Sequence, residues 1–92
     1  MLKLELSNES DKDIMSDFIL DLMNHHRRLN NAPKEYWCTL EEAKDMFTNW
    51  VKSGAVYKIE NDNTVIGFMY VKHLSTSVSV LEDFYIQSEY RG

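Results

Sequence analysis

The chain has 92 residues, 43% hydrophobic and 12% aromatic, which provides one small domain with one core and excludes a second. Its 15 acidic and 10 basic residues give a net charge of -5, which argues against nucleic acid as the main partner because a phosphate backbone demands a basic face. No apolar run approaches bilayer length, and the start LKLELSNESDKD lacks the apolar core of a signal peptide, so we expect no membrane partner and a cytoplasmic location.

The first third of the chain predicts one strand and one helix. Leucines alternate with polar residues over 2–7, which is typical of a half-buried strand with one apolar face. Asn8 or Ser10 can cap the helix that follows, and the helix should end before Pro33. The apolar stripe of this amphipathic helix consists of Ile14, Met15, Phe18, Ile19, Leu22 and Met23.

The clearest local signals in the sequence belong to a second helix within TLEEAKDMFTNWVKSG, residues 39–54. Thr39 and Glu42 have the spacing of a capping box, and Gly54 is suited to the C-terminal cap. The buried stripe of this helix is predicted to be Leu40, Ala43, Met46, Phe47, Trp50 and Val51.

Three further strands are predicted after this helix. The segments 55–60 and 64–74 form a plausible hairpin around a turn at 61–63, and the second of them is apolar on both faces, which places it in the middle of a sheet. The last strand covers 78–86. The order β-α-α-β-β-β predicts an α+β fold in which the helices pack on a mainly antiparallel sheet.

A carboxylate interrupts the apolar pattern of the last strand. Simple alternation gives Glu82 apolar neighbours on its own face and puts Asp83 on the opposite face. Partial burial would favour the protonated form of Glu82 and suit it to general-base work near neutral pH. The alternative is a hydrated Glu82 at the rim, or one paired with a lysine. The row with Glu82 contains Val78, Val80, Phe84 and Ile86, and the opposite row contains Ser79, Leu81, Asp83 and Tyr85.

The element order and the closing residues VLEDFYIQSEYRG, 80–92, resemble the GNAT superfamily of acetyl-CoA-dependent N-acetyltransferases. In that family the fourth strand runs into a loop of pattern Arg/Gln-x-x-Gly-x-Gly/Ala, and EYRG resembles its approach, with Arg91 and Gly92 as the first positions. LEDFYIQSEYRG is similar to the diamine and spermidine/spermine acetyltransferase branch. The resemblance implies that 1–92 is one incomplete domain, the N-terminal portion of the acyl-CoA N-acyltransferase fold, which stops inside the pyrophosphate loop.

By this resemblance, the full-length protein would transfer acetyl from acetyl-CoA to a primary amine, such as a small amine or a polyamine, and the chain alone would be poorly active or inactive. The resemblance gives Glu82 the role of the base that frees the amine of a proton. It assigns the cofactor's pantetheine arm to the backbone at Phe84, Tyr85 and Ile86, and its pyrophosphate to Arg91 and Gly92. The acceptor is expected to contact Tyr36, Trp37 and Asp83.

Other candidate residues favour structural interpretations. His25 and His26 are adjacent on a helix and point in different directions, so a metal or phosphate site is less probable than a structural or solvent-facing role. Cys38 has no partner for a disulfide and no zinc-ligand spacing. We expect Trp50 to pack in the core and no metal to be bound.

The rival hypothesis is a non-enzymatic half-domain that keeps the acetyltransferase scaffold as an interaction module. An incomplete domain of this fold leaves an apolar strand row uncovered. We therefore expect a homo-oligomer formed through the exposed sheet edge or by exchange of elements between copies.

Overall fold

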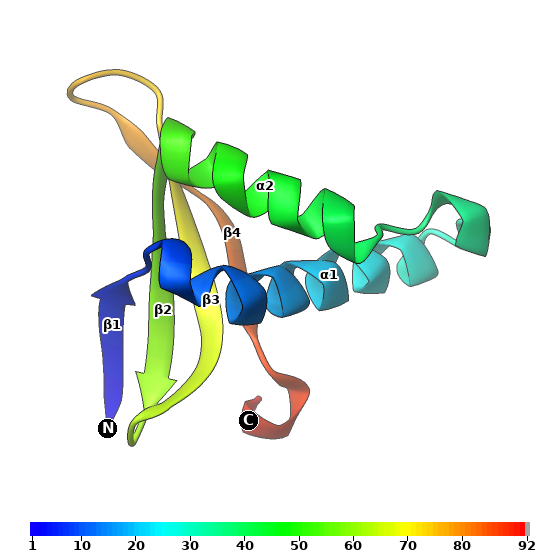
Figure 1. Ribbon diagram of the computed structural model, residues 1–92, viewed down its shortest axis with the longest axis horizontal. Helices are drawn as coiled ribbons and strands as arrows, with labels where there is room; N and C mark the ends of the chain where they lie inside the picture. Colours follow the sequence, from blue (N-terminus) through cyan, green and yellow to red (C-terminus); the bar gives the residue numbers. More distant parts are fainter. Residues whose placement is uncertain (92) are drawn as a thin grey trace.

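A computed structural model describes residues 1–91 of the chain, and Figure 1 shows a single sheet with two long helices packed on it. Three short 3-10 turns lie at Glu9–Asp11, Lys34–Tyr36 and Ser88–Tyr90. The strands and helices are β1 (Leu2–Leu6), α1 (Lys12–Leu29), α2 (Leu40–Ser53), β2 (Gly54–Asn61), β3 (Thr64–His73) and β4 (Ser79–Ile86).

The sheet has the order β1-β2-β3-β4, and every neighbouring pair is antiparallel. This confirms the predicted α+β fold class, the element order and the central place of β3. Asp62 and Asn63 adopt positive φ angles of 49° and 70° in the β2–β3 turn, a conformation that asparagine and aspartate tolerate. Because β4 is the last strand in the order, one of its edges is free of any strand in the described chain.

Capping fixes the predicted start of α2. The Glu42 backbone N–H donates to Thr39 Oγ1 at 3.2 Å, and the Thr39 backbone N–H donates to Glu42 Oε1 at 3.1 Å. Gly54 is the C-terminal cap. Asn8 plays the corresponding part before α1, where it caps the short turn that leads into the helix. The capping interpretations of Thr39, Glu42 and Gly54 are therefore confirmed, whereas Asn8 caps the preceding turn and Asp11, at the start of α1, makes no side-chain capping hydrogen bond.

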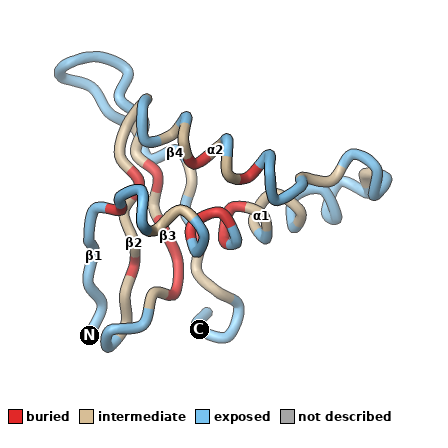
Figure 2. Tube along the Cα trace, in the orientation of Figure 1, coloured by how far each residue is buried: buried red, intermediate tan, exposed pale blue. Residues whose placement is uncertain are grey.

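Both helices cover the same face of the sheet, and the core lies between the two layers, as the buried segments in Figure 2 show. Met15, Ile19 and Phe47 are fully buried from the helices, and Phe68 is fully buried from the central strand. Within this core the ring of Tyr85 packs against the rings of both Phe18 and Phe68. The buried core cluster is Met15, Phe18, Ile19, Ala43, Phe47, Val56, Phe68, Tyr70 and Tyr85.

The other face of the sheet is uncovered in the described chain. β1 forms as predicted, but its expected half-burial is wrong: Leu2, Leu4 and Leu6 are 66%, 56% and 58% exposed. The register pairs Leu4 with Ile59 and Leu6 with Tyr57, so the leucines share a face that points away from the helices. We call this surface the open face; it comprises Leu2, Leu4, Leu6, Tyr57, Ile59, Met69, Val71, Leu81, Phe84 and Ile86.

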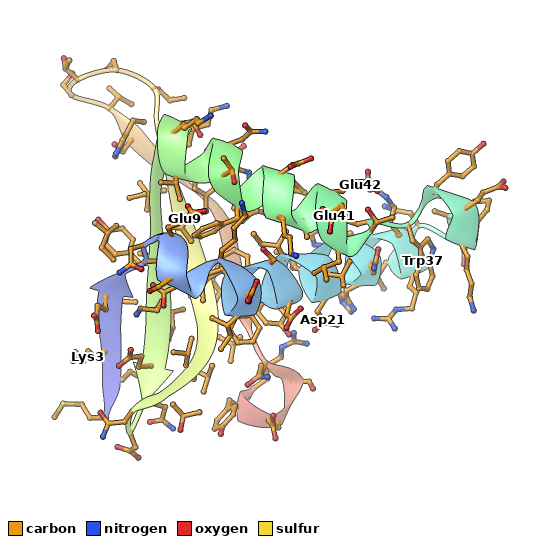
Figure 3. All side chains as sticks on the ribbon, in the orientation of Figure 1. Lys3, Glu9, Asp21, Trp37, Glu41 and Glu42 are labelled. Atoms are coloured by element: carbon orange, nitrogen blue, oxygen red, sulfur yellow. The ribbon has the colours of Figure 1, made fainter. Side chains whose placement is uncertain are left out.

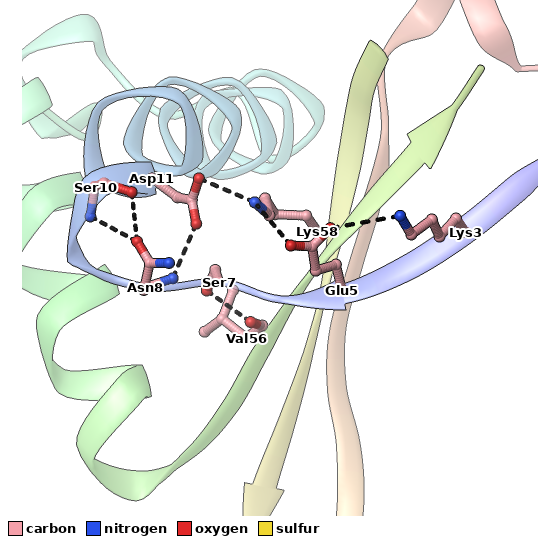
Figure 4. A network of polar contacts seen from close by, with 8 residues as sticks. All are labelled: Lys3, Glu5, Ser7, Asn8, Ser10, Asp11, Val56 and Lys58. Carbon is pink, nitrogen blue, oxygen red and sulfur yellow. Dashed lines mark hydrogen bonds and ion pairs between the residues drawn. The ribbon is translucent and has the colours of Figure 1, made fainter. Parts of the chain in front are cut away.

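A polar network ties β1 and the start of α1 to β2 (Figure 4). The Lys58 ammonium lies 3.2 Å from Asp11 and 3.9 Å from Glu5. Its hydrogen bond to Asp11 raises the pKa of Lys58. Ser7 Oγ donates to the Val56 carbonyl oxygen at 2.6 Å and satisfies a buried hydroxyl. The edge strand is thus held by polar contacts, since its leucines pack against no second layer.

Within the described residues, neither helix has the length and hydrophobicity to cross a membrane.

Candidate active site

A cavity of about 540 Å³ opens where both helices meet the end of the sheet formed by β3 and β4. Two carboxylates enter it from β4, one imidazole from α1 and one ammonium from β3. Apolar and uncharged polar side chains complete the wall. The lining residues are Met23, His26, Met46, Asn49, Trp50, Ser53, Tyr70, Lys72, Glu82 and Asp83.

An irregularity in β4 brings both carboxylates to this cavity. Tyr70 pairs with Asp83 and the next residue, Val71, pairs with Leu81, so Glu82 is an extra residue without a cross-strand partner. This is the pattern of a β-bulge, which re-aims side chains and breaks alternation. The predicted faces of β4 are therefore wrong on the N-terminal side of Glu82. Val80 shares the helix-covered face with Asp83, and Leu81 lies on the open face.

The two carboxylates have different surroundings. Glu82 is exposed, so the partial burial predicted for it is not found, whereas Asp83 is half-buried. Burial raises the pKa of the Asp83 carboxyl, the adjacent Glu82 carboxylate adds to the rise, and His26 opposes it. The burial and raised pKa expected for Glu82 are thus found at the next residue, Asp83.

An aromatic wall faces the carboxylates. The Trp50 and Tyr70 rings are stacked, with centroids 4.5 Å apart and an interplanar angle of 5°. The Tyr70 hydroxyl and the Ser53 hydroxyl are 2.5 Å apart, which fixes the far end of the stack. Trp50 packs against the core while its remaining surface lines the cavity. Its predicted packing role is confirmed, and the cavity adds a second, unpredicted role.

A second hollow, of about 320 Å³, lies along the free edge of β4. It brings together four of the five residues that the sequence assigns to the cofactor. Arg91 Nε donates to the Ile86 carbonyl oxygen at 2.6 Å, and its guanidinium lies 5.4 Å from the centroid of the Tyr85 ring. Gly92 lies outside the described residues. The lining residues are Leu22, His25, Phe84, Tyr85, Ile86 and Arg91.

The backbone of β4 alternates between its neighbour and the free edge. The Gln87 N–H donates to the Ile66 carbonyl of β3, so Gln87 points inward. The Ile86 carbonyl instead receives Arg91 from outside the sheet. Because alternate residues of an edge strand present their N–H and C=O groups outward, Phe84 and Ile86 offer the groups to which a strand-like ligand can add.

Tyr85 anchors this part of β4 to α1. Its side chain is 5% exposed, packs against Phe18 and Phe68, and donates its hydroxyl to the Asp21 carboxylate. Burial raises the pKa of Tyr85 to about 12; the hydrogen bond and the negative charge of Asp21 add to the rise, and Arg91 opposes it. Figure 3 labels Asp21 on α1.

We expect Tyr85→Phe to lower the free energy of unfolding at neutral pH by about 1–2 kcal/mol, because a hydrogen bond to a charged acceptor is lost. The folded chain keeps the Tyr85 proton to higher pH than the unfolded chain does. The contribution of this proton to stability is therefore lost as pH rises from about 10 to about 12. Urea titrations should show that the difference in unfolding free energy between wild type and Tyr85→Phe shrinks over this pH range. A difference that stays constant would contradict the role given to the Tyr85 proton. Asp21→Asn should lower the pKa of Tyr85.

The predicted acceptor residues Tyr36 and Trp37 do not join the Glu82 and Asp83 cavity. Trp37 lies at the end of the helical layer that is remote from the sheet, as Figure 3 shows, and its Nε1 donates to the Ala32 carbonyl oxygen at 2.9 Å. Tyr36 is 67% exposed and borders a separate hollow with Cys38. The structure therefore separates these two residues from Asp83.

Cys38 and the two histidines are the remaining reactive side chains considered from the sequence. Burial raises the pKa of the Cys38 thiol. The negative charge of Glu42 makes a smaller contribution in the same direction, and Arg27 opposes the rise. Residues 1–91 contain no group of three or more acidic, histidine or cysteine side chains that could hold a metal ion. His26, which the sequence interpretation left as structural or solvent-facing, is the one residue of the histidine pair that lines the large cavity.

Comparison with known proteins gives matches at the level of structure. No family model matches the sequence. No curated protein matches it either. A possible acetyltransferase from Clostridium difficile 630 superposes with a TM-score of 0.68 at 12% identity, over 99% of this chain and 60% of that chain. A GNAT-family acetyltransferase from Staphylococcus aureus Mu50 superposes with a TM-score of 0.63 at 16% identity, over 98% of this chain and 56% of that chain. The chain has the fold of the N-terminal part of a GNAT acetyltransferase.

The superpositions cover nearly all of this chain, but this chain spans only 60% and 56% of the length of these two proteins. A probable acetyltransferase from Staphylococcus epidermidis ATCC 12228 agrees, with a TM-score of 0.57 at 14% identity, over 98% of this chain and 57% of that chain. At such identities the likeness establishes the fold alone, so the chemistry has to be argued from the residues of the site.

Proposed function

We propose that this chain is the N-terminal part of a cytoplasmic N-acetyltransferase that moves an acetyl group from acetyl-CoA to a primary amine, with a small amine or a polyamine as acceptor. The β4 bulge carries the proposal, because it directs Glu82 and Asp83 into a cavity, and the residues that follow on the same strand border the hollow along the free edge. The residues proposed to bind the amine and those proposed to bind the cofactor then lie in neighbouring segments of one strand.

The described residues fit the extended part of the cofactor. The outward backbone groups of Phe84 and Ile86 can pair with the amides of a pantetheine arm as an added strand would. Arg91 lies at the end of the same edge, where a guanidinium suits a phosphate. Acetyl-CoA, when bound, supplies an acetyl thioester. The Ile86 carbonyl oxygen accepts a hydrogen bond from Arg91, so this bond would have to break before the carbonyl could pair with the cofactor.

Charge and protonation explain the acidic cavity. A primary amine is a cation at neutral pH, and the carboxylates of Glu82 and Asp83 attract cations. The amine attacks a thioester only as the neutral base, so the site needs a group that accepts its proton. The sequence interpretation gives proton removal to Glu82 and acceptor binding to Asp83, and both side chains line the cavity. The stacked faces of Trp50 and Tyr70 offer a further surface for an alkylammonium ion.

The test uses the complete polypeptide that the gene encodes, labelled acetyl-CoA and a panel of primary amines. We expect acetyl transfer to at least one amine, and a loss of about 10²-fold or more when Glu82→Gln and Asp83→Asn are combined. Circular dichroism would check that the double variant remains folded. Absence of transfer to every amine on the panel would contradict the proposed function.

A second candidate is a non-enzymatic module that associates with another copy of itself. The observation that favours it is the open face, where Leu2, Leu4 and Leu6 of β1 and Leu81 and Phe84 of β4 are each more than half exposed. Self-association without acetyl transfer by the complete polypeptide would favour this candidate.

A further inference from the structure

The two carboxylates of the cavity differ in a way that separates their roles. Asp83 is paired in the ladder opposite Tyr70, on the helix-covered face, and is half-buried. Glu82 has no ladder partner and is exposed at the rim. We propose, building on the acetyltransferase function above, that Asp83 accepts the proton of the acceptor ammonium, that Glu82 attracts and holds this ammonium, and that His26 sets the pH at which Asp83 acts.

Position favours Asp83 as the proton acceptor. A carboxylate with restricted access to water loses less by becoming neutral than an exposed one does, so a half-buried Asp83 is the better base. The exposed carboxylate of Glu82 lies where an incoming cation first meets the cavity, so it is suited to attract that cation. The raised pKa of Asp83 agrees with this division. Asp83 is also followed directly by Phe84, one of the two residues whose outward backbone groups are proposed to pair with the cofactor, so the proton acceptor and this part of the edge are adjacent.

The charged groups that face Asp83 come from three elements. Glu82 is its neighbour on β4, Lys72 lines the same cavity from β3, and His26 lines it from α1. The side chains that α2 contributes, Met46, Asn49, Trp50 and Ser53, carry no charge. His26 opposes the rise in the pKa of Asp83 that burial and the Glu82 carboxylate produce, so a positive charge on this imidazole favours the ionised form of Asp83.

Acetyl transfer removes two protons from the acceptor ammonium. Asp83 takes one proton from the ammonium, which leaves a neutral amine and a neutral carboxylic acid. The amine nitrogen forms a bond to the acetyl carbon, and the bond from that carbon to sulfur breaks. The second proton lost by the nitrogen goes to the departing thiolate sulfur, and Asp83 returns its proton to solvent.

Titration of the protein tests the assignment without any turnover. The carboxyl carbon of ¹³C-labelled Asp83 should titrate above the usual value of about 3.9 for aspartate. His26→Gln should move this midpoint upward, because the opposing cation is removed. His25→Gln, at the neighbouring residue that lines the other hollow, should leave it in place. A midpoint at the usual value, or one that His26→Gln does not raise, would overturn the assignment.

Kinetics on the complete polypeptide separates the two carboxylates. Asp83→Asn should lower kcat by about 10²- to 10⁴-fold with little change in the KM for the amine, whereas Glu82→Gln should mainly raise this KM. His26→Gln should move the acidic limb of the kcat/KM profile to higher pH. Full activity of Asp83→Asn would defeat the assignment alone. Absence of transfer by the wild type would defeat the acetyltransferase function and this role together.

Discussion

Replacement of Phe68 by alanine is expected to lower the free energy of unfolding by about 3–5 kcal/mol. Phe68 is fully buried in β3, and its ring packs against Trp50 on one side and Tyr85 on the other, with centroid distances of 5.8 and 5.9 Å. Truncation would leave a cavity beneath both hollows of the candidate site. A chain of this size is stabilised by only about 5–14 kcal/mol, so the loss is a large fraction of the total.

Thermal and urea denaturation of dilute protein would measure this effect, with an expected fall in Tm on the order of 12–40 °C. Phe84→Ala is the matched control, because it removes the same atoms from the same sheet at a side chain that is 55% exposed. Its effect should stay within about 0.5 kcal/mol. Equal losses for the two variants would mean that the open face is as well packed as the core, contrary to the structure.

Local sequence signals predicted most of the fold because their physical causes are local. The capping box of Thr39 and Glu42, the glycine at position 54 and the 3.6-residue stripe on α1 each act within a few residues. The element order and the α+β class follow from these signals and from period-two strands. The burial of β1 could not be predicted in this way, since alternation says that one face is apolar but not whether a second layer covers it.

The candidate site was predicted less completely, because it depends on a bulge. A regular strand puts Glu82 and Asp83 on opposite faces, and the single unpaired residue at Glu82 changes this, yet no glycine or proline marks the position. His26 was missed for a related reason. Its role depends on the approach of α1 to β3 and β4, which is set by packing between distant segments. The adjacency of Phe84, Tyr85 and Ile86 to Arg91 was predictable, because these residues are close along the chain.

The 92-residue chain is expected to self-associate through the open face. Leu4, Met69 and Phe84 border an apolar hollow of about 280 Å³ on this face, with the buried Ile59 beneath them, and each exposed apolar side chain that leaves water on association contributes up to about 1.5–3 kcal/mol. The free edge of β4 adds unpaired backbone groups that a second sheet can use. Light scattering should therefore give a molar mass above that of a monomer, rising with concentration.

Two charges on the open face should abolish this association. Leu4→Lys combined with Phe84→Lys puts a cation from each edge strand onto the same surface, and both positions are exposed enough for the folded chain to tolerate the change. Leu29→Lys is the matched control, since Leu29 is 68% exposed at the end of α1 and lies off the open face. Association that survives the double substitution would point to exchange of elements between copies. A strict monomer at high concentration for the unmodified chain would show that the apolar surface of this sheet is insufficient to hold two copies together.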